Sequence, residues 1–179
     1  VAETPDHPAL IEDDRTWSYR QLADNVAQVA VSLLALGIRP GDRMMVVSEN
    51  SIGLAAHLLA ASKINAWAIV VNPRLSPREL DQIRDHSGSR RMFFTAGVSA
   101  EAANHAQRVG AEIGRIGPLE NIGVSALNEA TLPEPVEASA AKQVAVLIYT
   151  SGTTGTPKGV MLTHEYLLFS AKTTALFRR

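Results

Sequence analysis

Apolar residues recur at steps of three and four over Leu22–Leu36, a spacing that predicts an amphipathic helix. Ser18 and Gln21 precede this stretch with the spacing of a capping box, and Gly37 follows it, where a helix commonly ends. After a Pro-Gly turn, a short apolar run over 44–47 predicts a buried strand. The first half of the chain therefore begins as helix followed by strand.

The same alternation continues along the chain. Further helices are predicted over 51–64, from Pro77 and over 99–109, and further strands over 66–71, 90–96 and 121–124. Ser76, Pro77 and Glu79 supply the N-cap, the first helical residue and the capping-box partner of the third helix. Strands that are apolar on both faces are typical of a parallel sheet covered on both sides. We therefore predict an α/β fold, a layered and mostly parallel sheet with helices on both faces.

A polar stretch with two prolines, 128–143, interrupts the alternation, and we interpret it as a surface linker. It would separate an α/β subdomain over 1–127 from a last part over 144–179. That last part reads as an apolar strand ending at Thr150, a loop, a second apolar run and a helix from about His164, with Thr163 as N-cap. We expect both strands beside the loop to be buried, so that they hold the loop in place.

Composition narrows the function classes. The 179 residues carry 17 basic and 18 acidic side chains, so no overall field favours nucleic acid or an anionic membrane. The chain has no cysteine, which excludes disulfides, thiol catalysis and thiolate metal sites. No apolar stretch approaches the ~18 residues of a membrane-spanning helix, and the acidic N-terminal stretch lacks the basic and apolar regions of a secretory signal. We expect a cytoplasmic protein with no nucleic-acid partner and no transmembrane segment.

The loop after Tyr149, YTSGTTGTPKGVMLTH, has the composition of an anion site. Between Thr150 and Gly159 it holds five hydroxyl residues, three glycines, one proline and one lysine, and no acidic residue occurs from 138 to 164. Glycines let successive N–H groups turn inward, hydroxyls donate to an ionised phosphate, and Lys158 supplies positive charge. Pro157 stiffens the loop because its ring fixes φ. The loop therefore predicts a phosphate-binding site.

Two common phosphate loops do not fit this one. In the pattern G-x-x-x-x-G-K-[ST], the second glycine would fall at Pro157, and Lys158 is followed by Gly159 instead of Ser or Thr. The glycine spacing also differs from the dinucleotide pattern G-x-G-x-x-G. The loop therefore argues against an ordinary phosphoryl-transfer NTPase.

The stretch IYTSGTTGTPKGVMLTH resembles, residue for residue, the phosphate-binding signature of the AMP-forming adenylating enzymes. That superfamily includes acyl-CoA synthetases, peptide-synthetase adenylation domains and luciferases. Two other stretches, 16–47 and 58–80, are similar to its first and second conserved segments. The resemblance runs through most of the chain in the right order, and it implies the N-terminal domain of an acyl-CoA synthetase-like fold.

The resemblance implies a two-step reaction. A carboxylic acid attacks ATP to give an acyl-adenylate and pyrophosphate, and the thiol of coenzyme A then displaces AMP; Mg²⁺ is implied as well. In the family this loop holds the phosphates that leave as pyrophosphate. By position, the residues that would contact phosphate or shape the loop are Thr150, Ser151, Gly152, Thr153, Thr154, Gly155, Thr156 and Lys158. Lys158 and Thr154 would stabilise charge, Gly159 would permit a turn, and the chain offers no general base, nucleophile or metal ligand to assign.

The chain departs from the family at Asn65, where glycine is usual, and the family's adenine, ribose, hinge and catalytic-lysine segments would lie beyond Arg179. The chain starts without methionine and ends inside a helical pattern, so we expect a fragment, designed or proteolytic, that does not complete the reaction alone. Strands left without neighbours would favour pairing with a second copy, a homo-oligomer.

Alternatives remain open. VVNPRLSPREL is more similar to fatty-acyl or aryl-acid ligases than to amino-acid adenylation domains, but a peptide-synthetase domain or a non-catalytic phosphate-binding module also fits the loop. Lys158 could be a solvated lysine, and Thr150 and Ser151 could satisfy strand-end backbone groups.

Other polar residues favour structural roles. We expect His57 to be partly buried and hydrogen-bonded, Asp81 and Asp85 to form ion pairs with nearby arginines and not a metal site, and Trp17 and Trp67 to belong to the core.

Overall fold

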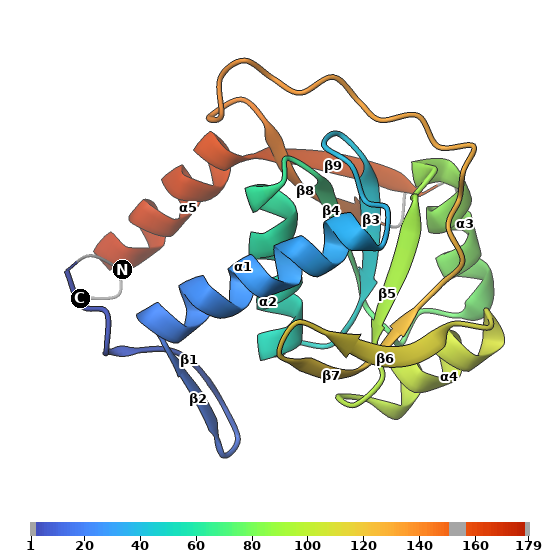
Figure 1. Ribbon diagram of the computed structural model, residues 1–179. Coiled ribbons are helices and arrows are strands. Elements are labelled where there is room, and N and C mark those ends of the chain that lie inside the picture. Colours follow the sequence, from blue (N-terminus) through green and yellow to red (C-terminus); the bar gives the residue numbers. More distant parts are fainter. Residues whose placement is uncertain (1–2, 151–156, 178–179) are drawn as a thin grey trace.

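The computed structural model describes residues 3–150 and 157–177 (Figure 1). In chain order the elements are β1 (Pro8–Glu12), β2 (Arg15–Ser18), α1 (Tyr19–Ala35), β3 (Arg43–Val47), α2 (Ile52–Lys63), β4 (Trp67–Val71), α3 (Pro77–Ser87), β5 (Arg91–Thr95), α4 (Ala100–Arg108), β6 (Glu112–Ile116), β7 (Leu119–Val124), β8 (Val144–Thr150), β9 (Lys158–Thr163) and α5 (His164–Phe177).

Seven strands form one sheet in the order β6-β7-β5-β3-β4-β8-β9. The four central strands β5, β3, β4 and β8 are parallel, whereas β7, β6 and β9 join antiparallel at the two flanks. The predicted layered α/β fold with a mostly parallel sheet is confirmed. Strand β6 was not predicted, because four of its five residues are exposed and it lacks an apolar run. The β1–β2 hairpin, a separate two-stranded sheet, was also missed.

Alternate residues of the central strands supply two core layers. Met44 and Val46 point to the face covered by α1 and α2, where they pack with Leu33. Met45 and Val47 point to the opposite face, where they pack with Leu80 of α3 and residues of α4. Figure 1 shows the two helix pairs on opposite sides of the sheet. Burial on both faces explains why these strands read as continuous apolar runs.

Local capping signals in the sequence are realised in the structure. Ser18 with Gln21 and Ser76 with Glu79 both form complete capping boxes. Asn65 takes the left-handed conformation, with φ 56°, at the turn that links α2 to β4. Asparagine tolerates that conformation better than most residues, so the departure from glycine is accommodated.

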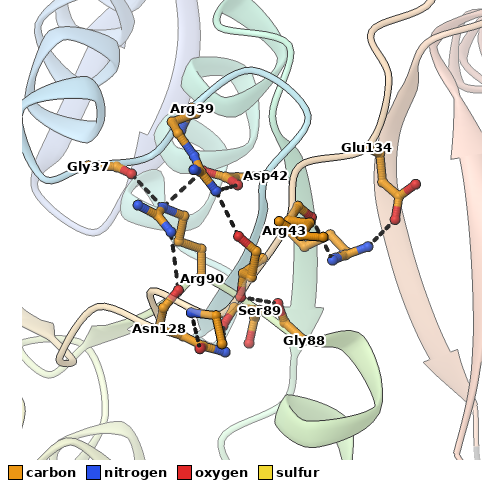
Figure 2. Close-up of polar contacts among 12 residues, drawn as sticks. Gly37, Arg39, Asp42, Arg43, Gly88, Ser89, Arg90, Asn128 and Glu134 are labelled. Atoms are coloured by element: carbon orange, nitrogen blue, oxygen red, sulfur yellow. Dashed lines mark hydrogen bonds and ion pairs between the residues drawn. The ribbon is translucent and has the colours of Figure 1, made fainter.

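A buried carboxylate orders the amino edge of the sheet. Asp42, which is fully buried, lies 2.9 Å from Arg39 Nη2 and 3.1 Å from Arg90 Nε, and its Oδ2 accepts a 2.7 Å bond from the Arg39 amide. Arg90 Nε also donates to the carbonyl of Gly37, just after α1 (Figure 2). Two guanidinium groups and an amide therefore satisfy the one buried charge, as buried ions require.

The same arginines fix the stretch 128–143, which contains no helix or strand. Arg39 donates to the carbonyl of Thr131 at 2.8 Å, and Arg90 donates to the carbonyl of Asn128 at 3.1 Å. Figure 2 also shows Arg43 in an ion pair with Glu134. The stretch predicted as a linker is thus hydrogen-bonded along the amino edge of the sheet up to Glu134.

Gly41 allows this close approach. Its φ is +80°, and a Cβ at this position would overlap the carbonyl oxygen of Glu134, whose amide donates to the Gly41 carbonyl at 2.9 Å. Only glycine combines the left-handed backbone with the missing side chain.

The last two elements, β9 and α5, are more exposed than the sequence suggests. Strand β9 is the edge of the sheet, and Val160 and Met161 are 48% and 61% exposed, so the prediction of two buried strands beside the loop is wrong for β9. Val160 and Met161 are consecutive residues and so point to opposite faces of the sheet, which means that both faces are open to solvent at this edge. Helix α5 extends away from the sheet (Figure 1) and has no buried residue between 164 and 177. Among the described helices, none is long and apolar enough to cross a membrane.

His57 is a fully buried residue of α2. Its Nδ1 lies 2.7 Å from the carbonyl of Gly53, and its ring lies 5.4 Å from that of Phe93. The predicted hydrogen bond is confirmed, and burial is complete instead of partial. Burial lowers the pKa of His57 to about 4, and the bond to the Gly53 carbonyl opposes this shift only in part. The folded protein therefore holds a neutral imidazole.

The free energy of unfolding should fall as the pH drops from about 6.5 to about 4, because only the unfolded chain then protonates His57. A shift from 6.5 to about 4 corresponds to about 3 kcal/mol. Urea unfolding across this range should show a steeper loss for the wild type than for His57→Gln, whose other titrating groups are the same. Parallel pH curves for the two proteins would contradict the assignment.

Gly41→Ala should destabilise the protein more than Gly110→Ala. Both glycines have positive φ, so alanine costs about 1 kcal/mol at each. Nothing lies within 4 Å of a Cβ at Gly110, whereas at Gly41 the stretch around Glu134 must move, which adds about 1–3 kcal/mol. Equal denaturation midpoints for the two variants would show that the contact with Glu134 is dispensable.

Candidate functional site

The predicted phosphate loop leaves the sheet at its carboxyl edge. Thr150 is the last residue of β8 and Lys158 is the first of β9, and the two are paired across the strands. Strand β8 is parallel to β4, so the loop begins at the same edge as the turn that follows β4. In open α/β sheets, ligands bind outside this edge.

Two of the predicted phosphate contacts can be placed. Thr150 and Lys158 are both exposed, and the strand pairing brings them together at the base of the loop. The other predicted contacts lie outside the described residues: Ser151, Gly152, Thr153, Thr154, Gly155 and Thr156. The described part of the site is therefore a threonine and a lysine at paired strand positions, residue types that suit an anion.

Gly159 has a role that the sequence did not indicate. It lies inside β9, paired with Tyr149, and its φ is not in the left-handed region, so its expected role in a turn is wrong. A Cβ at Gly159 would lie 3.1 Å from Cζ of Tyr149. A side chain at this position would press on the tyrosine ring, and the ring would have to shift by a few tenths of an ångström to make room.

Tyr149 also reaches helix α3. Its hydroxyl lies 2.9 Å from Nδ1 of His86, and the two rings meet edge to face with centroids 5.7 Å apart. Burial raises the pKa of Tyr149 above its ordinary value, while the nearby Ser87 hydroxyl and the charge of Arg43 act in the opposite direction. The phenol therefore keeps its proton at neutral pH and can donate it to His86.

Strands β3 and β5 end in linked hydroxyl groups at the carboxyl edge. Thr95 Oγ1 donates to Ser48 Oγ at 2.7 Å, and Ser48 Oγ lies 3.2 Å from Ser51 Oγ. Ser51 accepts from the amide of Leu54 at 3.0 Å and so caps α2. These hydroxyls bind one another and a helix end, which makes them part of the scaffold.

The turn after β4 is rigidly held beside the start of the loop. Nε2 of His105 lies 3.1 Å from the carbonyl oxygens of both Pro73 and Leu75. Between them, Arg74 pairs with Glu49 at 3.1 Å. A helix residue from a distant part of the chain thus fixes the neighbouring turn of the same edge.

Two hollows of the described protein lie away from the base of the loop. Cavities of about 470 and 460 Å³ lie at the flank formed by β5, β6 and the residues after β7, and Arg91 lines both. Neither cavity is lined by Thr150 or Lys158. A smaller one of about 260 Å³ is lined by Gly53, Thr95 and other residues at the carboxyl edge. Position at the ends of the parallel strands is better evidence for a phosphate site than cavity volume, because an anion needs donors and not an apolar hollow.

The remaining polar candidates behave as structural residues. Arg84 pairs with Asp81 at 3.0 Å and Asp85 at 2.8 Å, and Arg108 also binds Asp81, which confirms the expected ion pairs. Within residues 3–150 and 157–177 no group of three or more His, Asp or Glu could hold a metal ion.

The expected core and capping residues are in place. Trp17 is buried, and Trp67 is partly buried against the core beside α3 and α4. Thr163 accepts a 3.3 Å bond from the amide of Tyr166, as its predicted role of N-cap requires.

Comparison with known proteins identifies relatives for this arrangement. Residues 1–179 match the AMP-binding enzyme family. The chain is 30% identical to 3-hydroxybenzoate–CoA ligase from Aromatoleum sp. over 92% of this chain and 32% of the relative. It is 29% identical to the hybrid PKS-NRPS synthetase pvhA from Talaromyces variabilis, over 87% of this chain and 4% of that protein.

Solved structures agree with these matches. The N-terminal domain of FACL13 from Mycobacterium tuberculosis is 30% identical, with a TM-score of 0.68, and the match covers 92% of this chain and 42% of that one. O-succinylbenzoate coenzyme A synthetase from Bacillus subtilis, in complex with ATP and magnesium, is 25% identical with a TM-score of 0.69, covering 98% of this chain and 44% of that one. The chain thus spans about a third of the length of the CoA-ligase relative and under half of each structure.

Proposed function

Because the chain belongs to the AMP-binding enzyme family, we propose that it is the amino-terminal part of an AMP-forming acyl-CoA synthetase. The complete protein would join a carboxylic acid to ATP, releasing pyrophosphate, and would then pass the acyl group from AMP to the thiol of coenzyme A. Relatives named as CoA ligases support the acid–thiol ligase class.

One observation carries the proposal. A loop rich in glycine and hydroxyl residues follows a central parallel strand at the carboxyl edge of the sheet, and it is closed at its base by the paired residues Thr150 and Lys158. Negative charge builds up on the departing pyrophosphate as the acid attacks the α-phosphorus. Fixed donors aimed at that group stabilise the transition state more than the ground state.

The residues would act by binding and not by proton transfer. Lys158 would place an ammonium group on the leaving phosphates, and the Thr154 hydroxyl would add a directed hydrogen bond. The loop amides and the other hydroxyls, with Thr150 at its start, would complete the anion site. No residue of this chain is proposed as nucleophile or general base.

Mg²⁺ is commonly held by one or two carboxylates together with substrate phosphates. The described residues do not supply a set of carboxylates and imidazoles for a metal, so no ligand for the ion is proposed among them. When bound, the ion would neutralise phosphate charge; the chain's own contribution is the donor set of the loop.

For the acid, we propose a fatty or aryl carboxylic acid. The match to 3-hydroxybenzoate–CoA ligase supports an aryl acid, and the VVNPRLSPREL stretch favours the same ligases. The alternative, an adenylation domain of a peptide synthetase, keeps support from the match to a PKS-NRPS synthetase. A non-catalytic phosphate-binding module is the second alternative.

We further propose that the 179-residue chain alone does not turn over, since it spans only part of its relatives. ATP and coenzyme A as substrates favour the cytoplasm as its compartment. Pairing of two copies through the edge strand β9 is compatible with the exposure of Val160 and Met161.

The full-length protein should catalyse exchange of labelled pyrophosphate into ATP only when a carboxylic acid is present. A panel of fatty, aryl and amino acids distinguishes the ligase from the peptide-synthetase domain by which class supports exchange. Release of inorganic phosphate without exchange would favour an NTPase instead, and phosphate binding without either reaction would favour the non-catalytic module.

Lys158→Ala and Thr154→Val in the full-length protein should each slow adenylate formation by about 100-fold, the usual effect of removing one transition-state donor. Lys172→Ala, which removes an exposed lysine from α5, is the matched control and should leave the rate unchanged. Melting temperatures decide the interpretation: a loss of folded protein large enough to explain the lost rate would refute a role in charge stabilisation.

A further inference from the structure

We propose that Tyr149 and His86 are positioning residues that hold the Lys158 end of the β8–β9 pair against helix α3. The inference rests on the proposed function, in which Lys158 binds phosphate, and it assigns to this site two residues from outside the loop. Neither residue would touch the phosphates, and each would act through the strand pair.

The geometry joins three separate segments. Tyr149 precedes Thr150 and is paired with Gly159, so its ring lies one residue pair below Thr150 and Lys158. Its hydroxyl lies 2.9 Å from Nδ1 of His86, 63 residues away in the last turn of α3. Tyr149 therefore links the base of the loop to a helix that is packed on the core through Leu80.

Gly159 makes the link tight. The carbon atoms of the tyrosine ring lie so close to the glycine Cα that an added Cβ would be 3.1 Å from Cζ and 3.3 Å from the hydroxyl oxygen. The ring therefore rests directly on the backbone of β9, next to Lys158. A shift of the ring toward β9 would press on that backbone, and loss of the ring would remove its support.

Lys158 needs such support because it lies on an edge strand. On its inner side β9 is paired with β8, and two of its next residues, Val160 and Met161, are about half exposed or more. Short edge strands have fewer restraints than central ones. Binding groups must be held to about 0.5 Å to act on a transition state, so a contact that ties β9 to the helix layer bears directly on the position of Lys158.

If the His86–Tyr149 pair only stabilised the fold, its removal would have different effects from those expected for a positioning role. The His86–Tyr149 pair is partly exposed, and a hydrogen bond there contributes modestly to global stability. If the pair served stability alone, its loss would lower the melting temperature without changing anion affinity. If it positions Lys158, anion affinity changes more than stability does.

The test uses the full-length protein with four variants. Tyr149→Phe keeps the ring on Gly159 and removes the hydroxyl, His86→Leu removes the acceptor, and His86→Asn replaces it with an amide oxygen near the position of Nδ1. Tyr166→Phe, which alters an exposed tyrosine of α5, is the matched control. The readouts are the Kd of inorganic pyrophosphate by calorimetry, KM for MgATP and kcat in pyrophosphate exchange, and the melting temperature.

We expect Tyr149→Phe and His86→Leu to raise the pyrophosphate Kd and the KM for MgATP about three- to tenfold, the effect of one hydrogen bond. Melting temperatures should change by no more than a few degrees. His86→Asn should restore most of the affinity, and the double variant Tyr149→Phe/His86→Leu should be no weaker than either single variant, because both remove the same bond.

Gly159→Ala is an independent perturbation, since it changes neither Tyr149 nor His86 and acts on the ring through the new methyl group. Its new methyl group should push the ring aside and weaken pyrophosphate binding, and it should have little further effect once Tyr149→Ser has removed the ring.

The outcomes separate the two proposals. If the wild type catalyses exchange but Tyr149→Phe and His86→Leu bind pyrophosphate as the wild type does, the positioning role is overturned and the ligase function stands. If the wild type binds pyrophosphate without catalysing exchange, the ligase function fails and the Kd values still decide the positioning role. Additive losses in the double variant, or no rescue by His86→Asn, would also overturn it. A wild type that binds no pyrophosphate refutes both.

Discussion

The parallel pairing of β5, β3, β4 and β8 determines where chemistry can occur in this protein. Parallel strands all end at one edge of the sheet. The residues that follow them therefore lie at the same edge because of the sheet topology alone, and not because of direct contacts between them. The hydroxyls of Ser48 and Thr95, the turn around Arg74 and the base of the loop at Thr150 all lie at this edge. The opposite edge is left free for structural interactions.

At that opposite edge, a single buried charge organises the connection to β8. Asp42 would be very costly to bury alone, and Arg39 and Arg90 offset that cost. Each arginine then uses a remaining N–H group to bind a carbonyl of the stretch 128–143. The connection that leads into β8 is thus fixed by the same groups that solvate Asp42, so the strand carrying the loop starts from a defined position.

Local signals made the helices and central strands predictable. Capping boxes at Ser18 and Ser76 and the apolar periodicity each operate within a few residues, so they can be read from the sequence directly. The exposure of β9 could not be read in this way, because its apolar residues look like those of a buried strand and only the sheet order makes it an edge. The contact of His86 with Tyr149 and that of Arg39 with Thr131 join residues 63 and 92 positions apart, and no local pattern announces either.

The site residues show the same division. Thr150 and Lys158 are predicted as phosphate contacts because their chemistry is visible in the order of the loop, whereas Gly159 was given the wrong role because glycine usually signals a turn. Its actual role depends on the Tyr149 ring lying across the strand, a fact of packing between two strands. A motif thus predicts which residues contact a ligand. The role of the neighbouring glycine depends on how the rest of the fold packs around those residues. In this protein the Tyr149 ring packs on Gly159 of β9 and contacts His86 of α3. It thereby connects the edge strand that carries Lys158 to a helix packed on the hydrophobic core.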